Sequence, residues 1–306
     1  MLKALSYYYS AFKHPKVKDF IDMGFGIDAR YQRSKSFWNR HLELCKNFQI
    51  QALDELPHGA LISVLGAGSL LDIHTELLAR KFSRIDLYDA NPSAEKMWNK
   101  KFANLNVQIK SQIQDLSGCL EEWTSRLTSF AGKYTRNSEN VDSAVSEFLL
   151  NLKAPRLDIF NEKPDVVFSV NLLSQIPIYW RDRVHSILAK SLGIRTNEAG
   201  SYAQNLEDAL EKSMGELQAQ HLALLAGSGG ERIVLINDQE FLYYTSEHSL
   251  WQSEKALYID PTLSLPAYKL TAEDSWFWHI APQGIEERDY GCIHDVKARV
   301  FARAES

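Results

Sequence analysis

The feature that most constrains the fold of this chain is a repeated alternation of short apolar segments with segments of helical periodicity. Five apolar segments have the length and composition of buried strands: residues 60–65, 84–88, 106–110, 165–170 and 232–236. Segments with apolar residues three and four apart follow the first four. Strands that alternate with helices in this way are typical of a largely parallel sheet covered by helices on both faces.

Two further strand patterns lie near the C-terminus, at residues 275–280 and 293–302, and no helical pattern joins them. They are expected to form an antiparallel hairpin at one edge of the sheet. In the first of them Trp276 and Trp278 alternate onto one face, which favours packing in the core. The sequence therefore predicts a Rossmann-like α/β fold, with a seven-stranded, mostly parallel sheet and an antiparallel C-terminal hairpin.

The chain divides into a helical N-terminal segment and a larger α/β domain. Residues 1–57 have helical periodicity and are expected to form a lid or cap. Residues 58–306 are expected to form the α/β domain. Within that domain, residues 132–164 are less regular and are interpreted as an insertion, with a polar loop at 133–140 and a helix at 141–152.

Charge and cysteine content exclude several classes of protein. The chain has 34 Lys and Arg against 39 Asp and Glu, so it lacks the basic surface of a dedicated nucleic-acid binder. Its three cysteines lie far apart with no Cys-x-x-Cys pair, which favours a reducing compartment and gives no metal-binding spacing. No apolar run approaches the roughly 20 residues of a membrane helix, and no signal-peptide pattern is present. We expect a soluble, cytoplasmic protein without membrane contacts; its oligomeric state stays open.

Candidate binding residues follow the first three strands. In a parallel α/β sheet, ligands bind beyond the carboxyl ends of the strands. The turn Gly66-Ala67-Gly68 lets a ligand approach the backbone closely. Asp89, followed by Ala90, ends the second strand, where a carboxylate can accept both hydroxyls of a ribose. Asp115 follows the third strand, where it would meet an adenine amino group or cap the next helix. Together these residues outline a nucleoside pocket.

The spacing of the glycines distinguishes between nucleosides. A dinucleotide fingerprint requires Gly-x-Gly-x-x-Gly, but the sixth position here is Leu71. The turn carries no basic residue for a phosphate, and no Gly-Lys-Ser/Thr phosphate loop occurs.

This order of residues resembles the class I S-adenosylmethionine-dependent methyltransferases. The run Val64-Leu65-Gly66-Ala67-Gly68 matches the glycine-rich turn of the family, Asp89 its ribose acid and Asp115 its adenine-side acid. Residues 165–175 match the fourth strand and the loop that faces the transferred methyl group, and the resemblance covers about residues 58–304. It implies binding of S-adenosyl-L-methionine and transfer of its methyl group to a nucleophile.

The chain departs from the family pattern at two positions. Val64 stands where family members usually carry an acid, and Leu70 stands where they often carry a third glycine. Asp72 is a candidate to replace the missing acid. These departures keep two alternatives open: a nicotinamide-dependent oxidoreductase on a similar sheet, and a non-catalytic methyltransferase-like binding or scaffold protein.

The acceptor side is predicted from the residues after the fourth strand. Asn171, Ser174 and Gln175 are neutral hydrogen-bonding residues suited to orienting a substrate, although they could instead satisfy backbone groups of a loop. The chain lacks both the Asn/Asp-Pro-Pro-Tyr/Phe motif and the Pro-Cys nucleophile of family members that methylate nucleobases. A small-molecule acceptor is therefore preferred by elimination.

Four residues of the N-terminal helical segment are candidates to contact donor or acceptor: Tyr31, Arg33, Trp38 and His41. Arg33 could pair with a carboxylate, and His41, with Asn171, is a candidate catalytic residue. The same spacing is also that of a packed helix face. His294 adjoins Asp295, but on a strand the two point to opposite faces, and residues 286–289 have the composition of a solvated turn.

Overall fold

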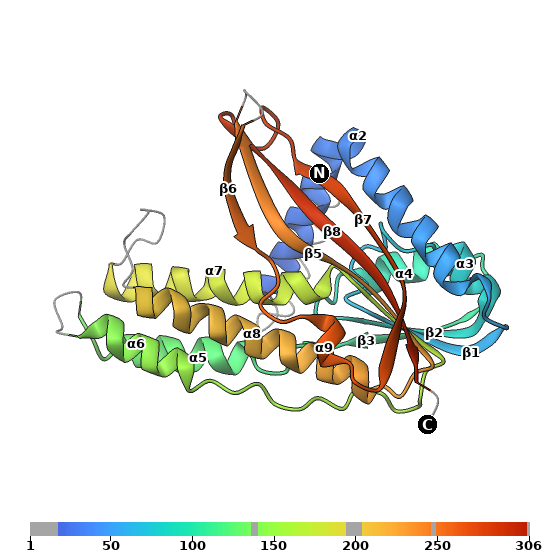
Figure 1. Ribbon diagram of the computed structural model, residues 1–306, viewed down its shortest axis with the longest axis horizontal. Helices are drawn as coiled ribbons and strands as arrows, with labels where there is room; N and C mark the ends of the chain where they lie inside the picture. Colours follow the sequence, from blue (N-terminus) through green and yellow to red (C-terminus); the bar gives the residue numbers. More distant parts are fainter. Residues whose placement is uncertain (1–17, 136–139, 194–203, 246–248, 305–306) are drawn as a thin grey trace.

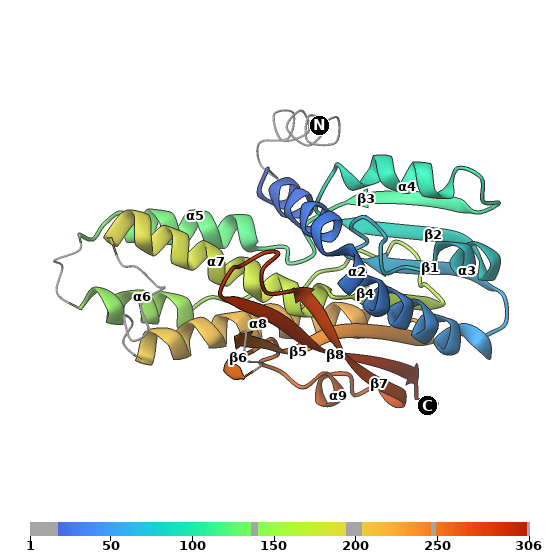
Figure 2. The ribbon, with the colours of Figure 1, turned by 90° about the horizontal axis from the view of Figure 1, so that it is seen from above.

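The computed structural model describes residues 18–135, 140–193, 204–245 and 249–304, and its centre is a single twisted sheet (Figures 1 and 2). Its strands are β1 (Gly59–Leu65), β2 (Phe82–Asp89), β3 (Gln108–Ile113), β4 (Val166–Val170), β5 (Arg232–Thr245), β6 (Leu250–Lys255), β7 (Tyr268–Ala281) and β8 (Tyr290–Arg303). Seven of them follow the order β3-β2-β1-β4-β5-β8-β7, and β6 pairs with β5 off this path. Strands β1 to β5 run parallel, whereas β8 is antiparallel to both β5 and β7.

This order confirms the predicted parallel sheet with an antiparallel C-terminal hairpin. The prediction of seven strands is one short, because β5 continues to Thr245 rather than ending near residue 236. Its extension pairs with β6 on one side and with β8 on the other. The four strands β5 to β8 therefore rise out of the sheet as an antiparallel wing (Figure 1).

Helices cover both faces of the sheet (Figure 2). The described helices are α2 (Lys18–Asp54), α3 (Thr75–Lys81), α4 (Ala94–Phe102), α5 (Leu120–Ala131), α6 (Val141–Leu150), α7 (Leu172–Leu192), α8 (Gln204–Gly227) and the short α9 (Pro261–Ser264). Buried side chains of α2, α3 and α4 form one core with the sheet, and those of α7 and α8 pack on the opposite face. The helices α5 to α8 extend beyond the sheet as a layer of their own.

The long helix α2 is part of the main core. Its apolar positions, three and four residues apart, place Trp38, Cys45 and Phe48 against the sheet. Trp276 and Trp278 of β7 are buried in the same core, as their alternation predicted. The helix is kinked at Ser34, whose φ of −110° and ψ of 20° are not helical. Of the helical pattern predicted over residues 1–57, residues 1–17 lie outside the described part.

The stretch 132–164 contributes one helix to the layer of α5 to α8. The predicted helix at 141–152 is present as α6, which ends at Leu150 and packs against α8. Val145 and Leu149 bury their side chains in the cluster that also holds Trp123 and Trp180. Of the polar loop predicted beside it, residues 136–139 lie outside the described part.

One predicted helix is shorter in the structure. The helical spacing over residues 70–82 gives a regular helix only in α3, because Leu70 adopts a left-handed backbone with φ of 53°. Gln49 of α2 then holds the following loop: its Nε2 donates to the Asp72 carbonyl (2.6 Å) and its Oε1 accepts from the His74 N–H (2.9 Å). The chain enters α3 only after this loop.

The expected loop after the fourth strand is instead the start of α7. Asn171 caps the helix with φ of 60°, a left-handed conformation that Asn tolerates better than most residues. Pro177 lies inside the helix and has no N–H for the Leu173 carbonyl. The Gln218 side chain of α8 supplies the missing donor at 3.2 Å, so the proline is accommodated without ending the helix.

Among the described residues, no helix combines the length and the apolar character needed to cross a membrane.

Candidate functional site

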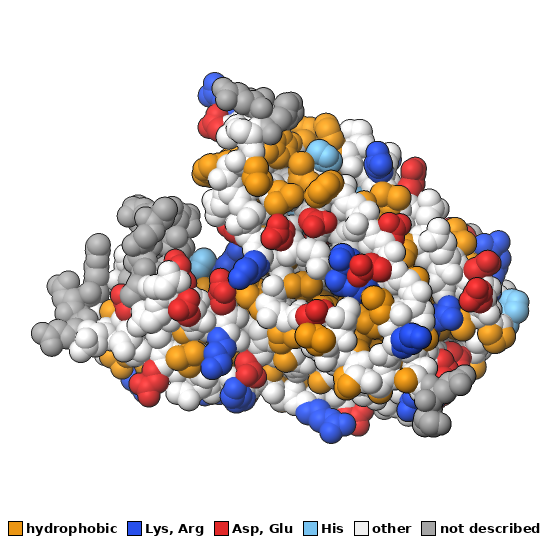
Figure 3. Space-filling model, viewed as in Figure 1, with side chains coloured by type: hydrophobic (Ala, Val, Ile, Leu, Met, Phe, Trp, Pro, Cys, Tyr) orange, Lys and Arg blue, Asp and Glu red, His pale blue; other side chains and the backbone are white. Residues whose placement is uncertain are grey.

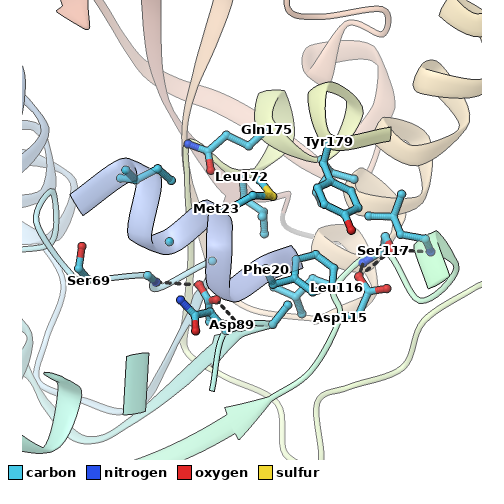
Figure 4. Close-up of a pocket in the computed structure, with 18 of the residues that line it drawn as sticks. Phe20, Met23, Ser69, Asp89, Asp115, Leu116, Ser117, Leu172, Gln175 and Tyr179 are labelled. Atoms are coloured by element: carbon cyan, nitrogen blue, oxygen red, sulfur yellow. Dashed lines mark hydrogen bonds between the residues drawn. The ribbon is translucent and has the colours of Figure 1, made fainter. Parts of the chain in front are cut away.

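A pocket opens at the carboxyl ends of the parallel strands (Figure 4). Its floor is the turn after β1 and the ends of β2 and β3, and its walls come from the first turns of α2 and α7. The space between the lining residues, counted with its open mouth, is about 880 Å³.

The glycine turn leaves the floor of the pocket free of side chains. Gly66 has φ of 69°, and a Cβ there would lie 3.1 Å from the Cβ of Leu172. Gly68 has φ of 45°, and its N–H donates to Oδ2 of Asp89 at 2.8 Å. The Trp98 indole N–H donates to the Gly68 carbonyl, also at 2.8 Å. The turn is therefore fixed at both its N–H and its C=O. Ala67 is buried between the two glycines and is not among the lining residues.

Asp89 faces the pocket with spare capacity for hydrogen bonds. Its Oδ2 accepts from Gly68 and its Oδ1 accepts from the Asn91 N–H at 2.7 Å. A carboxylate has about four acceptor positions, so roughly two remain for groups in the pocket. Burial raises the pKa of Asp89, and the two backbone N–H groups act against this rise. Two vicinal hydroxyls of a ribose match the remaining capacity.

Asp115 lines the pocket and also shapes the turn before α5. Its Oδ1 accepts from both the N–H (2.8 Å) and the hydroxyl (2.7 Å) of Ser117. The Ser117 hydroxyl in turn accepts from the Leu120 N–H at 3.1 Å, at the start of α5. The capping role considered for this residue is thus present. Among the described residues no hydrogen bond reaches the second oxygen, Oδ2, so it can accept from an amino group in the pocket, which Asp115 lines (Figure 4).

Apolar side chains form the rest of the pocket wall. The rings of Phe20 from α2 and Tyr179 from α7 stack at 5.1 Å and 17°. Leu116, Leu120 and Ile176 also line the pocket. No Lys, Arg or His is among the described lining residues, and the only charged ones are the two aspartates already described. Such a pocket favours an uncharged ring system with hydroxyl and amino groups over a phosphate-bearing ligand.

Other predicted site residues lie in or near this pocket. Ala90 and Gln175 line it. Asn171 does not; its side chain points to Asp72, whose Oδ2 accepts from Nδ2 at 2.9 Å. Burial raises the pKa of Asp72, while hydrogen bonds, including the one from Asn171, and nearby lysines lower it. Asp72 therefore approaches the end of β4 rather than the pocket itself.

The lid candidates Tyr31, Trp38 and His41 form an aromatic cluster with β7 and do not line the pocket. The Trp38 indole donates to the Ile280 carbonyl at 2.9 Å. His41 accepts from the Trp276 indole at 3.0 Å and stacks on the Trp278 ring at 3.9 Å. Burial lowers the pKa of His41 to about 3. The geometry is that of a packed helix face.

Arg33 binds a residue of the β7–β8 loop. Its Nε and Nη2 donate to the two carboxylate oxygens of Glu286 at 2.8 and 2.7 Å, and Arg30 approaches the same carboxylate at 3.5 Å. The prediction of a solvated turn over 286–289 is wrong for Glu286, whose side chain is only 10% exposed because it holds these two arginines. This ion-pair cluster ties α2 to the end of the wing.

Several lining residues were not predicted. On α7 they are Leu172, Ile176 and Tyr179, spaced four and three residues apart with Gln175 between them. This is the spacing of one helix face, whereas the residues directly after the fourth strand are expected to form a loop. On α2 the lining residues are Phe20, Met23, Gly24 and Ile27, which lie one to three turns before the predicted candidates. Apolar side chains at helical spacing were the available signal in both elements.

A second polar cluster lies beside the start of α7. His294 and Asp295 do lie on opposite faces of β8, but His294 has another partner. Its Nδ1 lies 3.1 Å from Oδ1 of Asp238, a buried carboxylate on β5. Oδ2 of Asp238 accepts from the Ser174 hydroxyl at 2.8 Å. Burial alone would raise the pKa of Asp238, but the charge and hydrogen bond of His294, with the Ser174 bond and His41, lower it below its usual value.

Within the described ranges, no group of three or more His, Cys, Asp or Glu side chains is arranged to hold a metal ion.

Comparisons with known proteins give matches in structure only. No protein-family model matches the chain, and no curated protein matches its sequence. The N-methyltransferase NodS from Bradyrhizobium japonicum, solved with S-adenosyl-L-homocysteine, is similar with 9% identity, 88% of each chain covered and a TM-score of 0.40.

Two other solved structures are similar to a comparable degree. A S-adenosylmethionine-dependent methyltransferase from Clostridium acetobutylicum has 12% identity and a TM-score of 0.40, with 85% of this chain and 90% of that chain covered. A putative RNA methyltransferase from Pyrococcus horikoshii has 10% identity and a TM-score of 0.36, with 90% and 85% covered. At these identities and TM-scores, nothing about the function of this chain follows from the matches.

Proposed function

We propose that this chain, whose strand order is the one expected of class I S-adenosylmethionine-dependent methyltransferases, binds S-adenosyl-L-methionine in the pocket at its strand ends and transfers the methyl group to a small molecule. The observation that carries the proposal is Asp89. It is a carboxylate at the end of β2, held by two backbone N–H groups, and it retains acceptor positions toward a pocket without basic residues.

The residues of the pocket fit a nucleoside. Asp89 would accept the two ribose hydroxyls, and the free oxygen of Asp115 would accept from the adenine amino group. The adenine ring would lie among Leu116, Ile176 and the stacked pair of Phe20 and Tyr179. The bound donor would supply a methyl group on a positively charged sulfur. The chain's own contribution is to orient the two reactants and exclude water, for which α2 covers the pocket as a lid.

The composition of the pocket favours a small, uncharged acceptor. A nucleic acid would require basic side chains near the reaction site, and none lines the pocket among the described residues. On the face shown in Figure 3, Lys and Arg side chains lie interspersed with Asp and Glu and form no continuous basic surface. The formal net charge of −5 agrees with this preference.

The two alternatives have less support. A nicotinamide dinucleotide carries a pyrophosphate, which the described pocket meets with no cation, and Leu71 stands where its fingerprint requires glycine. A non-catalytic descendant is favoured only by the departures at Val64 and Leu70. The backbone at Leu70 nevertheless keeps the left-handed conformation for which glycine is suited.

Calorimetric titration with S-adenosyl-L-homocysteine tests the proposal. We expect binding by the wild type, and a loss of at least about tenfold in affinity for Asp89→Asn, which is isosteric but offers one acceptor oxygen fewer. Asp289→Asn, at an exposed acid outside the pocket, is the matched control and should bind as the wild type does. A wild type that binds NADH and not S-adenosyl-L-homocysteine would instead establish the oxidoreductase alternative.

A further inference from the structure

The pair of His294 and Asp238 stands next to the candidate pocket but is not part of it. Asp238 follows the parallel section of β5 by two residues, since Ile236 is the last residue paired with β4. It binds Ser174, and the neighbouring Gln175 lines the pocket. Adjacent strands lie about 4.8 Å apart, so Asp238 is one strand away from the residues that follow β4. Asp238 therefore lies at the same edge of the sheet as the pocket at the ends of β1 to β3, and β4 separates the two.

The backbone at this point is shaped to present the pair. The pairing of β5 with β8 shifts register between Asp238 and Glu240, which is a β-bulge. Bulges re-aim side chains and are common next to active sites. The bulge turns Asp238 toward His294 and Ser174, so β5, β8 and α7 meet at one carboxylate.

Buried polar atoms without partners surround the pair. The two facing atoms, Nδ1 of His294 and Oδ1 of Asp238, lie 3.1 Å apart, within ion-pair distance but outside hydrogen-bond geometry, and neither has a hydrogen-bond partner among the described residues. The indole N–H of Trp278, which lies edge-on to the His294 ring at 5.3 Å, is also buried and has no partner among the described residues. Leaving such a group unsatisfied costs about 1–3 kcal/mol. A ligand with a polar hydrogen and an acceptor oxygen would satisfy them.

Of the two members of the pair, His294 is the more accessible. Asp238 is 2% exposed and His294 12% exposed, so only the imidazole keeps an accessible edge. Titratable groups that interact electrostatically with Asp238 include His41 and Cys45 from α2, and Cys292 and Asp295 on β8. Strand β7 contributes Trp278 and α7 contributes Ser174, which do not titrate. Apolar contacts come from Phe241, whose ring lies 4.4 Å from that of His294.

We propose that His294, oriented by Asp238, is the general base of the methyl transfer, and that the acceptor is an uncharged, partly apolar molecule that presents a hydroxyl group. The inference rests on the proposed function. An alcohol or phenol keeps its proton at neutral pH, so a base must remove that proton as the oxygen attacks. A neutral amine can attack through its lone pair and does not need a base for this step.

The step balances in atoms and charge. The hydroxyl O–H bond breaks and its proton passes to Nε2 of His294, while Nδ1 donates to Asp238. The oxygen forms a bond to the methyl carbon. The bond between that carbon and the sulfur breaks, and its electron pair remains on sulfur, which becomes a neutral thioether. The imidazolium that forms is stabilised by the Asp238 carboxylate and is then deprotonated by solvent.

The test uses phenol and benzyl alcohol, with aniline and benzylamine as their nitrogen analogues, on the full chain. His294→Ala is compared with His279→Ala, a histidine on the opposite, exposed face of β7. Both variants should bind S-adenosyl-L-homocysteine as the wild type does, because neither residue lines the pocket. We expect methylation of a hydroxyl compound with kcat reduced about 10²–10⁴-fold in His294→Ala and little change in KM. Added imidazole should restore part of the rate, and Asp238→Asn should also reduce kcat.

A readout independent of turnover is the proton NMR signal of the His294 ring, assigned by its absence from His294→Ala. In protein saturated with S-adenosyl-L-homocysteine, the hydroxyl compounds should shift this signal and leave that of His279 in place. The assignment of His294 is overturned if S-adenosyl-L-homocysteine binds but no hydroxyl compound shifts the signal. It is also overturned if His294→Ala keeps kcat within about threefold of the wild type. In both cases the proposed function stands. If S-adenosyl-L-homocysteine does not bind the wild type, both the proposed function and the assignment of His294 are overturned.

Discussion

At the scale of single residues, Leu70 differs from the expected glycine in its side chain but keeps the backbone conformation that favours glycine. Leu70 occupies the position of a third glycine with φ of 53°, and its side chain is 1% exposed. A left-handed conformation costs a non-glycine residue roughly 1–2 kcal/mol. Burial of a leucine side chain yields about 1.5–3 kcal/mol, so the apolar core can offset this strain. The turn is kept by packing where relatives of the fold would use glycine.

This balance predicts an unusual order of stabilities. Both Leu70→Ala and Leu70→Gly should lower the free energy of unfolding, by about 2–5 kcal/mol for the lost side chain. Leu70→Gly should nevertheless be at least as stable as Leu70→Ala, because glycine alone relieves the backbone strain. Urea denaturation measures the difference.

The matched control is Leu78, equally buried but inside α3. There the glycine variant should be less stable than the alanine variant by about 1 kcal/mol. The same order at both positions would contradict the strain argument for Leu70.

At the scale of elements, the structure depends on contacts that join distant helices and loops. The Gln218 side chain is an example: besides the Leu173 carbonyl it binds the Ala256 carbonyl at 2.8 Å and accepts from the Tyr258 N–H at 2.8 Å. One buried amide thus completes α7 at Pro177 and also fixes the segment after β6.

Gln218→Leu should therefore destabilise the protein by about 2–4 kcal/mol, because three buried backbone groups lose their partner. In Pro177→Ala the new N–H can bind the Leu173 carbonyl within the helix. The double variant should then lose less stability than the sum of the two single variants, by about 1 kcal/mol. Strict additivity in a double-mutant cycle would show that Gln218 does not compensate for the proline.

The ion pairs of Arg30 and Arg33 with Glu286 hold α2 directly after the turns that form one wall of the pocket. Glu286→Ala should change stability by no more than about 1 kcal/mol, since Arg33 is half exposed and such pairs contribute little. It should, however, speed dissociation of S-adenosyl-L-homocysteine several-fold, because α2 is freer to leave the pocket. Stopped-flow displacement measures the rate; unchanged rates would show that α2 does not act as a lid.

Glu287→Ala is the control, since the neighbouring side chain is exposed. High salt should raise the dissociation rate of the wild type toward that of Glu286→Ala and leave the Glu286→Ala rate itself unchanged.

Elements with a strong local pattern could be predicted, and those defined by partners could not. The apolar run ending at Gly66 predicted β1 and its turn, and the alternation at Trp276 predicted the packed face of β7. Strand β6 has almost no buried side chain, so no periodicity marks it; it exists because β5 extends beside it. The start of α7 could not be predicted from local spacing, because the helix continues through Pro177 and the donor that the proline lacks comes from Gln218 of another helix.

At the scale of the whole molecule, the core contains imidazole rings in their neutral form. Burial lowers the pKa of His41 to about 3 and that of His221, which hydrogen-bonds to Ser169 at 2.8 Å, to about 4. An unfolded histidine has a pKa near 6.5, so acid favours the unfolded chain. The contact between His294 and Asp238 also depends on the whole molecule. It arises from the register in which β5 pairs with β8, and no local spacing in the sequence predicts that register.

The protein should therefore lose stability as the pH falls from about 6.5 toward 4, by about 1.4 kcal/mol per pH unit for each buried histidine. Asp72 and Asp89 oppose this loss, because burial raises their pKa and the folded state takes up their protons first. In His41→Gln the new side chain can still accept from the Trp276 indole. This variant should reduce the slope of stability against pH by about 1.4 kcal/mol per pH unit, the contribution of one buried histidine. Denaturation at a series of pH values measures it.

The exposed His58 provides the comparison, and His58→Gln should keep the slope of the wild type. An equal slope in wild type and His41→Gln would mean that His41 does not titrate on unfolding.

The contacts of α2 also set a constraint on how the chain is made. Trp38 and His41 find their partners 242 and 235 residues later, in β7, which is among the last elements to leave the ribosome. Until then the middle of the helix has an aromatic surface with nothing to cover it, even if its C-terminal half is already packed on the parallel strands. The nascent protein is therefore most exposed to aggregation, and most dependent on chaperones, through α2, the earliest of the described helices in the chain.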